Sequence, residues 1–475
     1  MKKKVVSALL CATMVATMFA GCGSKNDSNT SDKNTGDTSA AEDTADAADA
    51  ASSNLSDDGK VLNIYCWNEE FKSRITAHYP DYQEVDATHG KIGDVDVVWN
   101  ITPNDDNAYQ NNLDATLLNQ ADAPADDKID LFLVEADYAL KYVDTDYTVP
   151  VKDLGITDDD LSKQYQYTKD IVTDSKGVLK GLSWQGCPGV LFYNRDAAKE
   201  VLGTDDPDKV QESVKDWDTY NDTAKKMKDA GYKMTASAND TYRVYSNNVT
   251  SKWVDGNKIN IDDNIMKWVD DSKAQVDAGE TGTCDLWSDD WSKGFYPQGK
   301  VFCYFGPAWL VNFSMAADTE GSIGYNGGWG AAQGPQGFFW GGTWICAAQG
   351  TDNANLVKDI MLKMTTDDDI MKDIVVDDDD FVNNSTVMNG LADGSIKVKD
   401  DKEYTSKILG GQNPLPMYCA GVETLDLSNL SSYDQGCNEE FQNAMKNYFE
   451  GKASKEDALD LFYKAVTEKY PELTY

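Results

Sequence analysis

Short apolar runs alternate with helix-like spacings in the part of the chain that follows residue 60. Residues 61–67, 94–99 and 129–134 are apolar runs of strand length, bounded by polar turns. Residues 109–117, between the last two runs, carry apolar side chains at every fourth position, which is the spacing of one helix face. Strands that alternate with helices predict a mostly parallel sheet covered by helices, and hence an α/β fold.

The same alternation continues to the C-terminus. Further predicted elements are a helix over 217–227 that stops at Gly231, a strand over 232–236, a strand over 344–348, and helices over 353–364, 438–449 and 454–469. The last helix opens with Ser454 and, three residues later, Asp457, a pairing typical of a helix N-terminus.

The N-terminus has the pattern of a targeting segment. Residues 1–4 are basic and residues 5–20 are apolar, a run too short and wrongly flanked for a membrane span. Cys22 follows the sequence Phe-Ala-Gly, which resembles the bacterial lipobox. We therefore expect residues 1–21 to be a signal peptide and Cys22 to carry lipid that anchors the protein at the extracytoplasmic face of the bacterial cell membrane. An ordinary secretory leader with an incidental cysteine is the alternative.

Residues 22–60 have the composition of a linker. Beyond Cys22 they contain no aromatic residue, and Leu55 is their only large aliphatic side chain. Such a segment cannot bury enough apolar surface to fold, so we expect a flexible tether between lipid and protein.

Composition and charge exclude several classes of function. Hydrophobic residues make up 41% of the chain, too much for a wholly disordered protein. The net charge of −38 comes without a basic stripe, so we expect no nucleic-acid partner. His78 and His89 are the only histidines and neither lies in a nucleophile motif, which disfavours a hydrolase triad. The sequence carries no recognisable cofactor motif, and we expect no cofactor.

Metal and redox chemistry are disfavoured on similar grounds. The seven cysteines beyond Cys22 show no CxxC spacing, and Cys66, Cys303 and Cys346 lie in apolar runs, where we expect buried thiols. The four contiguous carboxylates of residues 377–380 lack the alternating spacing of a calcium loop. We expect them to form a solvated turn and not a metal site.

Several motifs, in this order, resemble the extracellular solute-binding proteins of ABC importers, in the maltodextrin-binding-like family that takes up sugars. They are the strand of residues 61–68, DLFLVEADY at 130–138, GVLKGLSW at 177–184, LFYNRD at 191–196 and GKVFCYFGPAW at 299–309. The resemblance covers nearly the whole body of the chain. It implies a periplasmic-binding-protein-like α/β fold, in which a hinge joins two discontinuous lobes with the ligand cleft between them.

The order of the motifs also implies the boundaries of the lobes. Residues 61–184 plus about 340–385 would form the N-terminal lobe, and residues 185–339 plus about 386–475 the C-terminal lobe.

A sugar offers an apolar C–H face and a rim of hydroxyl groups, so its site needs aromatic platforms and planar hydrogen-bonding groups. In parallel sheets, ligands bind at the carboxyl ends of the strands. The ligand-binding residues that we expect are Trp67, Asn68, Glu69, Glu135, Asp137, Trp184, Gln185, Trp309, Trp329, Trp340 and Trp344. Among them, Asp137 resembles the sugar-binding carboxylate of the family.

The resemblance implies a monomeric lipoprotein, without enzymatic activity, that binds a sugar or oligosaccharide outside the cell. Hinge closure around the ligand would then present it to the permease subunits of an ABC transporter. Three alternatives remain open: the same scaffold with a peptide or polyamine as ligand, a purely structural surface lipoprotein, and an anchored glycoside hydrolase that uses Glu135 and Asp137.

Overall fold

The computed structural model describes residues 55–475, so the predicted signal peptide, Cys22 and most of the predicted linker lie outside the described residues. Residues 55–60, the end of that linker, are bonded to the folded body. The backbone N–H of Ser56 donates to the carbonyl of Thr351 at 3.2 Å, and that of Gly59 to Asp352 at 2.8 Å. The expectation of a tether up to residue 60 is therefore corrected for these six residues. Their polar side chains gave no sign of folding, because the hydrogen bonds that hold them are made by the backbone.

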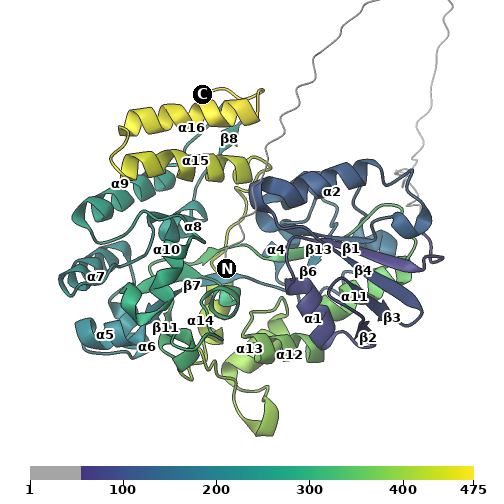
Figure 1. The fold of residues 1–475 in the computed structure, drawn as a ribbon, viewed down its shortest axis with the longest axis horizontal. Coiled ribbons are helices and arrows are strands. Elements are labelled where there is room, and N and C mark those ends of the chain that lie inside the picture. The colour runs from purple at the N-terminus through teal and green to yellow at the C-terminus, as the bar shows by residue number, and fades with distance from the viewer. Residues whose placement is uncertain (1–54) are drawn as a thin grey trace, which may run out of the picture. The chain divides into compact units, whose positions relative to one another are not determined.

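The larger sheet has seven strands in the order β2-β3-β4-β1-β5-β13-β6 (Figure 1). They are β1 (Val61–Cys66), β2 (Tyr82–Glu84), β3 (His89–Ile92), β4 (Val95–Ile101), β5 (Leu131–Glu135), β6 (Leu182–Ser183) and β13 (Thr343–Ala347). β1 pairs in parallel with β4 and with β5, whereas the other pairings are antiparallel. The helices α1 (Glu70–His78) and α2 (Ala108–Leu118) lie in the connections of the parallel strands. This arrangement confirms the predicted α/β fold, but the expectation of a mostly parallel sheet is wrong, because only two of the six pairings in the larger sheet are parallel.

The smaller sheet is built around β7 and is antiparallel. Its strands are β7 (Pro188–Asn194), β10 (Cys303–Gly306), β11 (Trp329–Ala332) and β12 (Phe338–Phe339), and a separate hairpin consists of β8 (Val254–Asp255) and β9 (Lys258–Ile259). The chain passes from the smaller sheet to the larger one between β12 and β13, through Trp340, Gly341 and Gly342.

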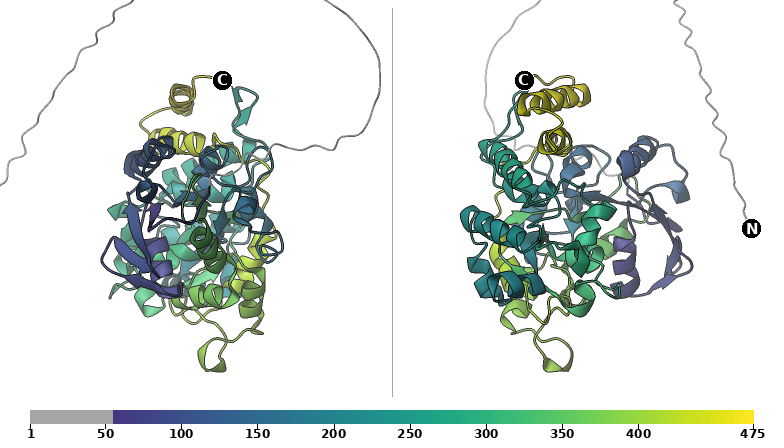
Figure 2. Two further views of the ribbon diagram at one scale, coloured as in Figure 1. Left: turned by 90° about the vertical axis from the view of Figure 1, so that its right-hand side faces the viewer. Right: turned by 60° about the vertical axis from the view of Figure 1, so that its left-hand side comes forward.

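Helices cover both sheets. The remaining α-helices are α3 (Ala139–Val143), α4 (Gln166–Asp170), α5 (Arg195–Leu202), α6 (Pro207–Glu212), α7 (Trp217–Asp229), α8 (Tyr242–Ser246), α9 (Asp263–Ala278), α10 (Asp289–Ser292), α11 (Ala354–Thr366), α12 (Asp368–Asp378), α13 (Ser385–Asp393), α14 (Leu415–Val422), α15 (Asp434–Phe449) and α16 (Lys455–Lys469). Single-turn helices are η1 (Asp105–Asn107), η2 (Ala125–Asp127), η3 (Ala136–Tyr138), η4 (Val151–Leu154), η5 (Ala238–Thr241), η6 (Lys293–Phe295), η7 (Pro297–Gly299), η9 (Gly324–Asn326), η10 (Lys399–Asp401) and the π-helix η8 (Leu310–Ser314). The C-terminal helices α15 and α16 pack side by side (Figure 2).

The predicted helices are confirmed in α2, α7, α11, α15 and α16, and Ser454 caps α16 by accepting a hydrogen bond from the N–H of Asp457. The predicted strand over 232–236 is wrong, because this segment makes only isolated bridges, such as that of Lys233 to Val301. The acidic run 377–380 is not a solvated turn either. It ends α12, and the side chain of Asp380 is 2% exposed.

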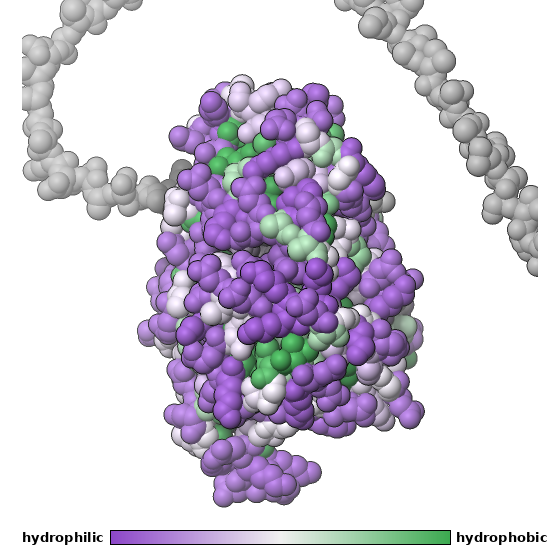
Figure 3. Space-filling model, turned by 90° about the vertical axis from the view of Figure 1, so that its left-hand side faces the viewer, coloured by the Kyte–Doolittle hydropathy of each residue, from purple (hydrophilic) through white to green (hydrophobic). Residues whose placement is uncertain are grey.

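None of the helices within residues 55–475 combines the length and the hydropathy that a membrane span requires. The face shown in Figure 3 is mostly hydrophilic, with hydrophobic residues in small, separate spots. Cys66, Cys303 and Cys346 are buried free thiols, as predicted, because each lies on a strand of a packed sheet.

Candidate functional site

A cavity of about 310 Å³ lies where the carboxyl ends of β1 and β5 meet η8 and the segments that precede α10 and follow β12. The residues that line it are Trp67, Asn68, Glu70, Glu135, Gln185, Trp287, Trp309, Phe313, Ser314, Trp340, Gly341, Gly342 and Thr343. Its volume is at the lower end of the range of small-molecule sites, roughly 300 to 1,000 Å³. Ligands bind at such strand ends in many α/β proteins, and the position therefore suits a binding site.

Tryptophan side chains form much of the cavity wall. Trp309 stacks on Trp287 with ring centroids 6.1 Å apart and meets Trp340 edge to face at 5.5 Å. The indole N–H of Trp309 donates to the backbone carbonyl of Trp340 at 3.3 Å. On the side of the larger sheet, Trp67 is held edge to face by Tyr109 at 5.7 Å. These contacts fix the rings before a ligand arrives, so little side-chain entropy is lost on binding.

Trp287 is the exposed member of this tryptophan wall. Its side chain is 52% exposed and its backbone is left-handed, with φ of 68°. A bulky residue in this conformation costs about 1 to 3 kcal/mol, and such strain gathers at functional sites. Trp287 comes from the loop between α9 and α10, where no pattern in the sequence distinguished it from an ordinary surface residue.

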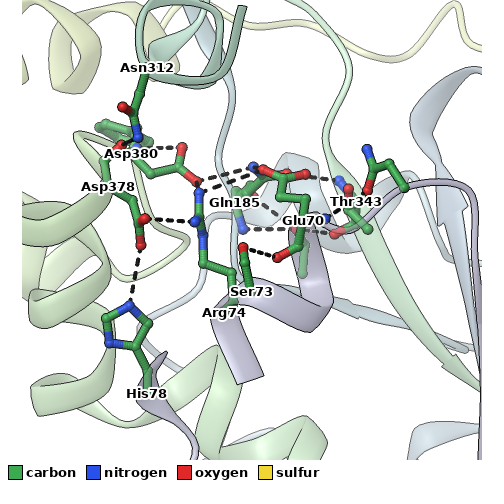
Figure 4. A network of polar contacts seen from close by, with 12 residues as sticks. Glu70, Ser73, Arg74, His78, Gln185, Asn312, Thr343, Asp378 and Asp380 are labelled. Carbon is green, nitrogen blue, oxygen red and sulfur yellow. Dashed lines mark hydrogen bonds and ion pairs between the residues drawn. The ribbon is translucent and has the colours of Figure 1, made fainter. Parts of the chain in front are cut away.

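A network of polar contacts stands behind the cavity and positions Glu70, the first residue of α1 (Figure 4). Gln185 donates its side-chain N–H to Glu70 Oε1 at 2.8 Å and to Asp380 Oδ2 at 3.1 Å, while its Oε1 accepts from the N–H of Thr343 at 3.1 Å. These bonds occupy both donors of the Gln185 amide. Gln185 therefore orients a carboxylate and has no donor left for a ligand.

Arg74 is the cation of the network. Its guanidinium lies 2.7 Å from Asp378 Oδ1 and 3.8 Å from carboxylate oxygens of both Glu70 and Asp380, with 8% of its side chain exposed. Burial raises the pKa of the Glu70 carboxyl to about 7, an effect that the positive charge of Arg74 opposes. The site thus keeps a carboxyl group at the cavity that titrates near neutral pH.

Glu135 is the second carboxyl group of the cavity. Its Oε2 accepts from the backbone N–H of Asp137 at 2.7 Å, and its Oε1 accepts no hydrogen bond from the described residues. Burial raises the pKa of Glu135, and the negative charge of Asp137 raises it further. Glu135 therefore presents an acceptor oxygen that a ligand could satisfy.

Two glycines let the backbone approach this wall closely. Gly341 and Gly342 have φ of 69° and 104°, in the region that favours glycine. A Cβ atom at Gly341 would lie 3.4 Å from the ring of Trp309 and 3.5 Å from Glu135 Oε1. At Gly342 it would lie 3.0 Å from the sulfur of Cys187. Larger residues here would fill the cavity floor or displace its neighbours.

Of the eleven residues expected from the sequence, the cavity brings together six: Trp67, Asn68, Glu135, Gln185, Trp309 and Trp340. Trp184, Trp329 and Trp344 lie instead in the core, each at most 1% exposed. Trp184 stacks on Phe71, and Trp344 donates its indole N–H to the carbonyl of Thr168. Their rings fill the interior because they belong to strands, or follow directly from strands, that are buried on both faces.

Glu69 and Asp137 also lie outside the cavity wall. Glu69 is exposed, and its neighbour Glu70 lines the cavity in its place. Asp137 pairs through both carboxylate oxygens with Arg243 of α8, which connects the end of β5 to the side of the smaller sheet. The pair borders a hollow of about 70 Å³, room for a few water molecules but not for a sugar.

The lining residues that were not among the eleven expected are Glu70, Trp287, Phe313, Ser314, Gly341, Gly342 and Thr343. Glu70 is the neighbour of the expected Glu69. It could have been found by considering both glutamates, because the direction of the side chains changes where α1 begins. In the part of the chain that the structure describes, no group of three or more His, Cys, Asp or Glu residues is placed to hold a metal ion.

Comparisons with known proteins agree with this geometry. Residues 94–405 match the family model described as bacterial extracellular solute-binding protein. Among solved structures, an extracellular solute-binding protein of family 1 aligns at 17% identity with a TM-score of 0.67, over 86% of this chain and 99% of that one. No curated protein matches the sequence.

Two further solved structures come from bifidobacteria. The ABC-transporter-associated binding protein from B. animalis subsp. lactis, in complex with β-1,6-galactobiose, has 19% identity and a TM-score of 0.64, over 87% and 99% of the two chains. The galacto-N-biose/lacto-N-biose I-binding protein from Bifidobacterium longum has 14% identity and a TM-score of 0.62, over 87% and 96%. These likenesses confirm the expected fold. Since the family model spans well over half of its length, the chain belongs to the bacterial extracellular solute-binding protein family.

Proposed function

We propose that the protein captures a sugar or short oligosaccharide outside the cell and delivers it, chemically intact, to the permease of an ABC importer. The observation that carries this proposal is the composition of the cavity wall. It combines Trp67, Trp287, Trp309 and Trp340 with the carboxyl groups of Glu70 and Glu135. Flat indole faces suit the C–H face of a sugar ring, and carboxylates suit its hydroxyl rim. The sugars in the complexes of the two bifidobacterial proteins support the same ligand class.

Delivery would depend on hinge closure. Trp67, Glu70 and Glu135 lie at or just after the ends of strands of the larger sheet. Trp287 and Trp309 lie in the loop before α10 and after β10, within the proposed C-terminal lobe, so only a closed protein applies both sets to one ligand. The lobe boundaries that we propose remain 61–184 plus about 340–385, and 185–339 plus about 386–475. The ion pair of Asp137 with Arg243 and the donation from Asn312 Nδ2 to the carbonyl of Asp378 at 2.7 Å would hold the closed form.

The proposal includes a monomer anchored through lipid on Cys22 after removal of residues 1–21. The sequence around Cys22 supports it, together with the polar spacer that follows. Replacing Cys22 by serine should abolish incorporation of labelled palmitate and shift the protein from the membrane fraction. Equal labelling of the variant would contradict the anchor and leave the binding proposal intact.

Isothermal titration calorimetry of the purified full-length protein against mono-, di- and trisaccharides tests the proposal. We expect heat of binding for at least one sugar. No heat with any sugar, or heat only with peptides or polyamines, would refute sugar capture.

Product analysis distinguishes binding from hydrolysis. The carboxyl pair that a hydrolase reading would use is divided, since Asp137 is engaged by Arg243 while Glu135 faces the cavity. We expect overnight incubation with the bound sugar to return it unchanged. Release of new reducing ends that disappears in a Glu135→Gln variant would favour the enzyme.

A further inference from the structure

We propose that the sugar taken up in this cavity carries a protonated amine, so that the substrate class is an amino sugar with a free ammonium group. This inference rests on the proposed function and narrows it. Three features of the described residues carry it: the charge of the cavity wall, the engagement of the nearby arginines, and the aromatic faces.

The cavity wall is acidic. Its described lining residues include the two carboxyl groups of Glu70 and Glu135 and no Lys, Arg or His. One oxygen of Glu135 has no hydrogen-bond partner among the described residues. A carboxylate removed from water without a partner is costly, and a cation in the cavity would supply that partner through a short, charge-assisted bond.

The two nearby arginines compensate the charge of this wall only in part. Arg74 lies behind Glu70 and gives its shortest contact, 2.7 Å, to Asp378, while Arg243 is engaged by both carboxylate oxygens of Asp137 (Figure 4 shows the Arg74 group). The carboxylates of the wall and of its bonded neighbours outnumber the two arginines: Glu70, Glu135, Asp137, Asp378 and Asp380. Burial opposes the ionisation of Glu70 and Glu135, and a cation in the cavity would stabilise the charged form of both carboxyl groups.

The rings of the wall favour a cation as well. Trp287, Trp309 and Trp340 gather within 6.1 Å of one another, centroid to centroid, and Phe313 lies beside them on the same wall. The face of an indole ring attracts an ammonium group electrostatically, in addition to stacking on a sugar ring. A neutral sugar would use the stacking and hydrogen bonds from its hydroxyl groups to the carboxylates, whereas an amino sugar would add the attraction of its ammonium group to the rings and to the carboxylates.

The charge of the whole molecule acts in the same direction. A net charge of −38 at pH 7 raises the local concentration of cations and speeds their association, more so at low ionic strength. It offers no such advantage to a neutral sugar.

Titration calorimetry at pH 7 with the purified full-length protein tests the proposal. The probes are glucosamine and galactosamine, each compared with its neutral parent sugar and with its N-acetyl derivative. We expect one amino sugar to bind at least tenfold tighter than both of its neutral counterparts, which corresponds to about 1.4 kcal/mol. In the Glu135→Gln variant this gap should shrink below about threefold. The control variant Glu468→Gln, which removes an exposed carboxylate of α16, should keep it.

Each other result has a defined meaning. If neutral sugars bind as tightly as the amino sugars, or bind when the amino sugars do not, the amine is refuted and sugar capture stands. If no sugar binds, or only the diamine putrescine does, both proposals fall. Should Glu135→Gln not fold, the wild-type comparison and the Glu70→Gln variant decide the matter.

Discussion

Replacing Arg74 by methionine should destabilise the protein strongly, and more at pH 8 than at pH 5. The guanidinium contacts Asp378 at 2.7 Å and lies 3.8 Å from both Glu70 and Asp380. All of these side chains are largely buried, with Arg74 8% and Asp380 2% exposed. Removing one member of a buried ion pair leaves the other charges uncompensated, and typically costs about 3 to 5 kcal/mol.

The pH dependence follows from the carboxyl groups that remain. The pKa of Glu70 is already raised from 4.5 to about 7, and loss of Arg74 raises it further, because Arg74 opposes the effect of burial. A carboxyl group with a raised pKa in the folded state holds a proton that the unfolded chain releases, so stability falls as pH rises from about 5 to above 7. A further rise of this pKa adds at most about 1.4 kcal/mol to the deficit at pH 8, because a pKa above 8 already leaves the folded-state carboxyl group protonated at that pH.

Urea unfolding, followed by tryptophan fluorescence at pH 5 and pH 8, measures this deficit. The matched control is Lys152→Met, which removes an exposed partner of Asp158 and should cost less than about 0.5 kcal/mol at either pH. The double variant with Glu70→Gln should recover part of the loss, because it removes one orphaned charge. A deficit that is equal at both pH values, or no larger than that of the control, would refute the reasoning about the network.

The site and its backbone give further predictions. Trp340→Ala should weaken sugar binding at least tenfold in calorimetry, about 1.4 kcal/mol. The control Tyr325→Ala removes an exposed aromatic ring that does not line the cavity and should leave the affinity unchanged. Equal affinities of the two variants would mean that the Trp340 ring does not stack on the sugar. In urea unfolding, Gly342→Ala should lower the free energy of unfolding by about 1 to 3 kcal/mol more than Gly203→Ala. Both glycines have a positive φ, but a Cβ atom would be crowded only at Gly342. Equal losses in the two variants would show that this crowding does not affect stability. Sugar binding should protect the fluorescence of Trp287 from quenching by acrylamide, and this protection should vanish in Trp287→Phe. If the protection persists in that variant, the sugar covers a different tryptophan.

The sequence was sufficient for most of the fold, because local periodicity reports burial. The spacing at Tyr109, Leu113 and Leu117 predicted α2, and all three side chains are buried. The segment 232–236 failed because an extended conformation does not become a strand without continuous neighbours.

The site was predictable only in part. Tryptophan at a strand end can face either a cavity or the core, and no local pattern distinguishes Trp340 from Trp344. The network of Arg74 and Asp380 joins segments far apart in the sequence, so neither residue stood out alone. Glu69 and Glu70 differ by one position where β1 gives way to α1, which suffices to turn one side chain outward and the other into the cavity.

A crystal structure of the protein with its tightest-binding sugar tests the central claim most directly. We predict the sugar in the cavity of about 310 Å³, with its ring against Trp309 or Trp340 and a polar group within hydrogen-bonding distance of Glu70 or Glu135. A sugar bound elsewhere on the protein, with the cavity unoccupied or filled by a side chain, would contradict the account.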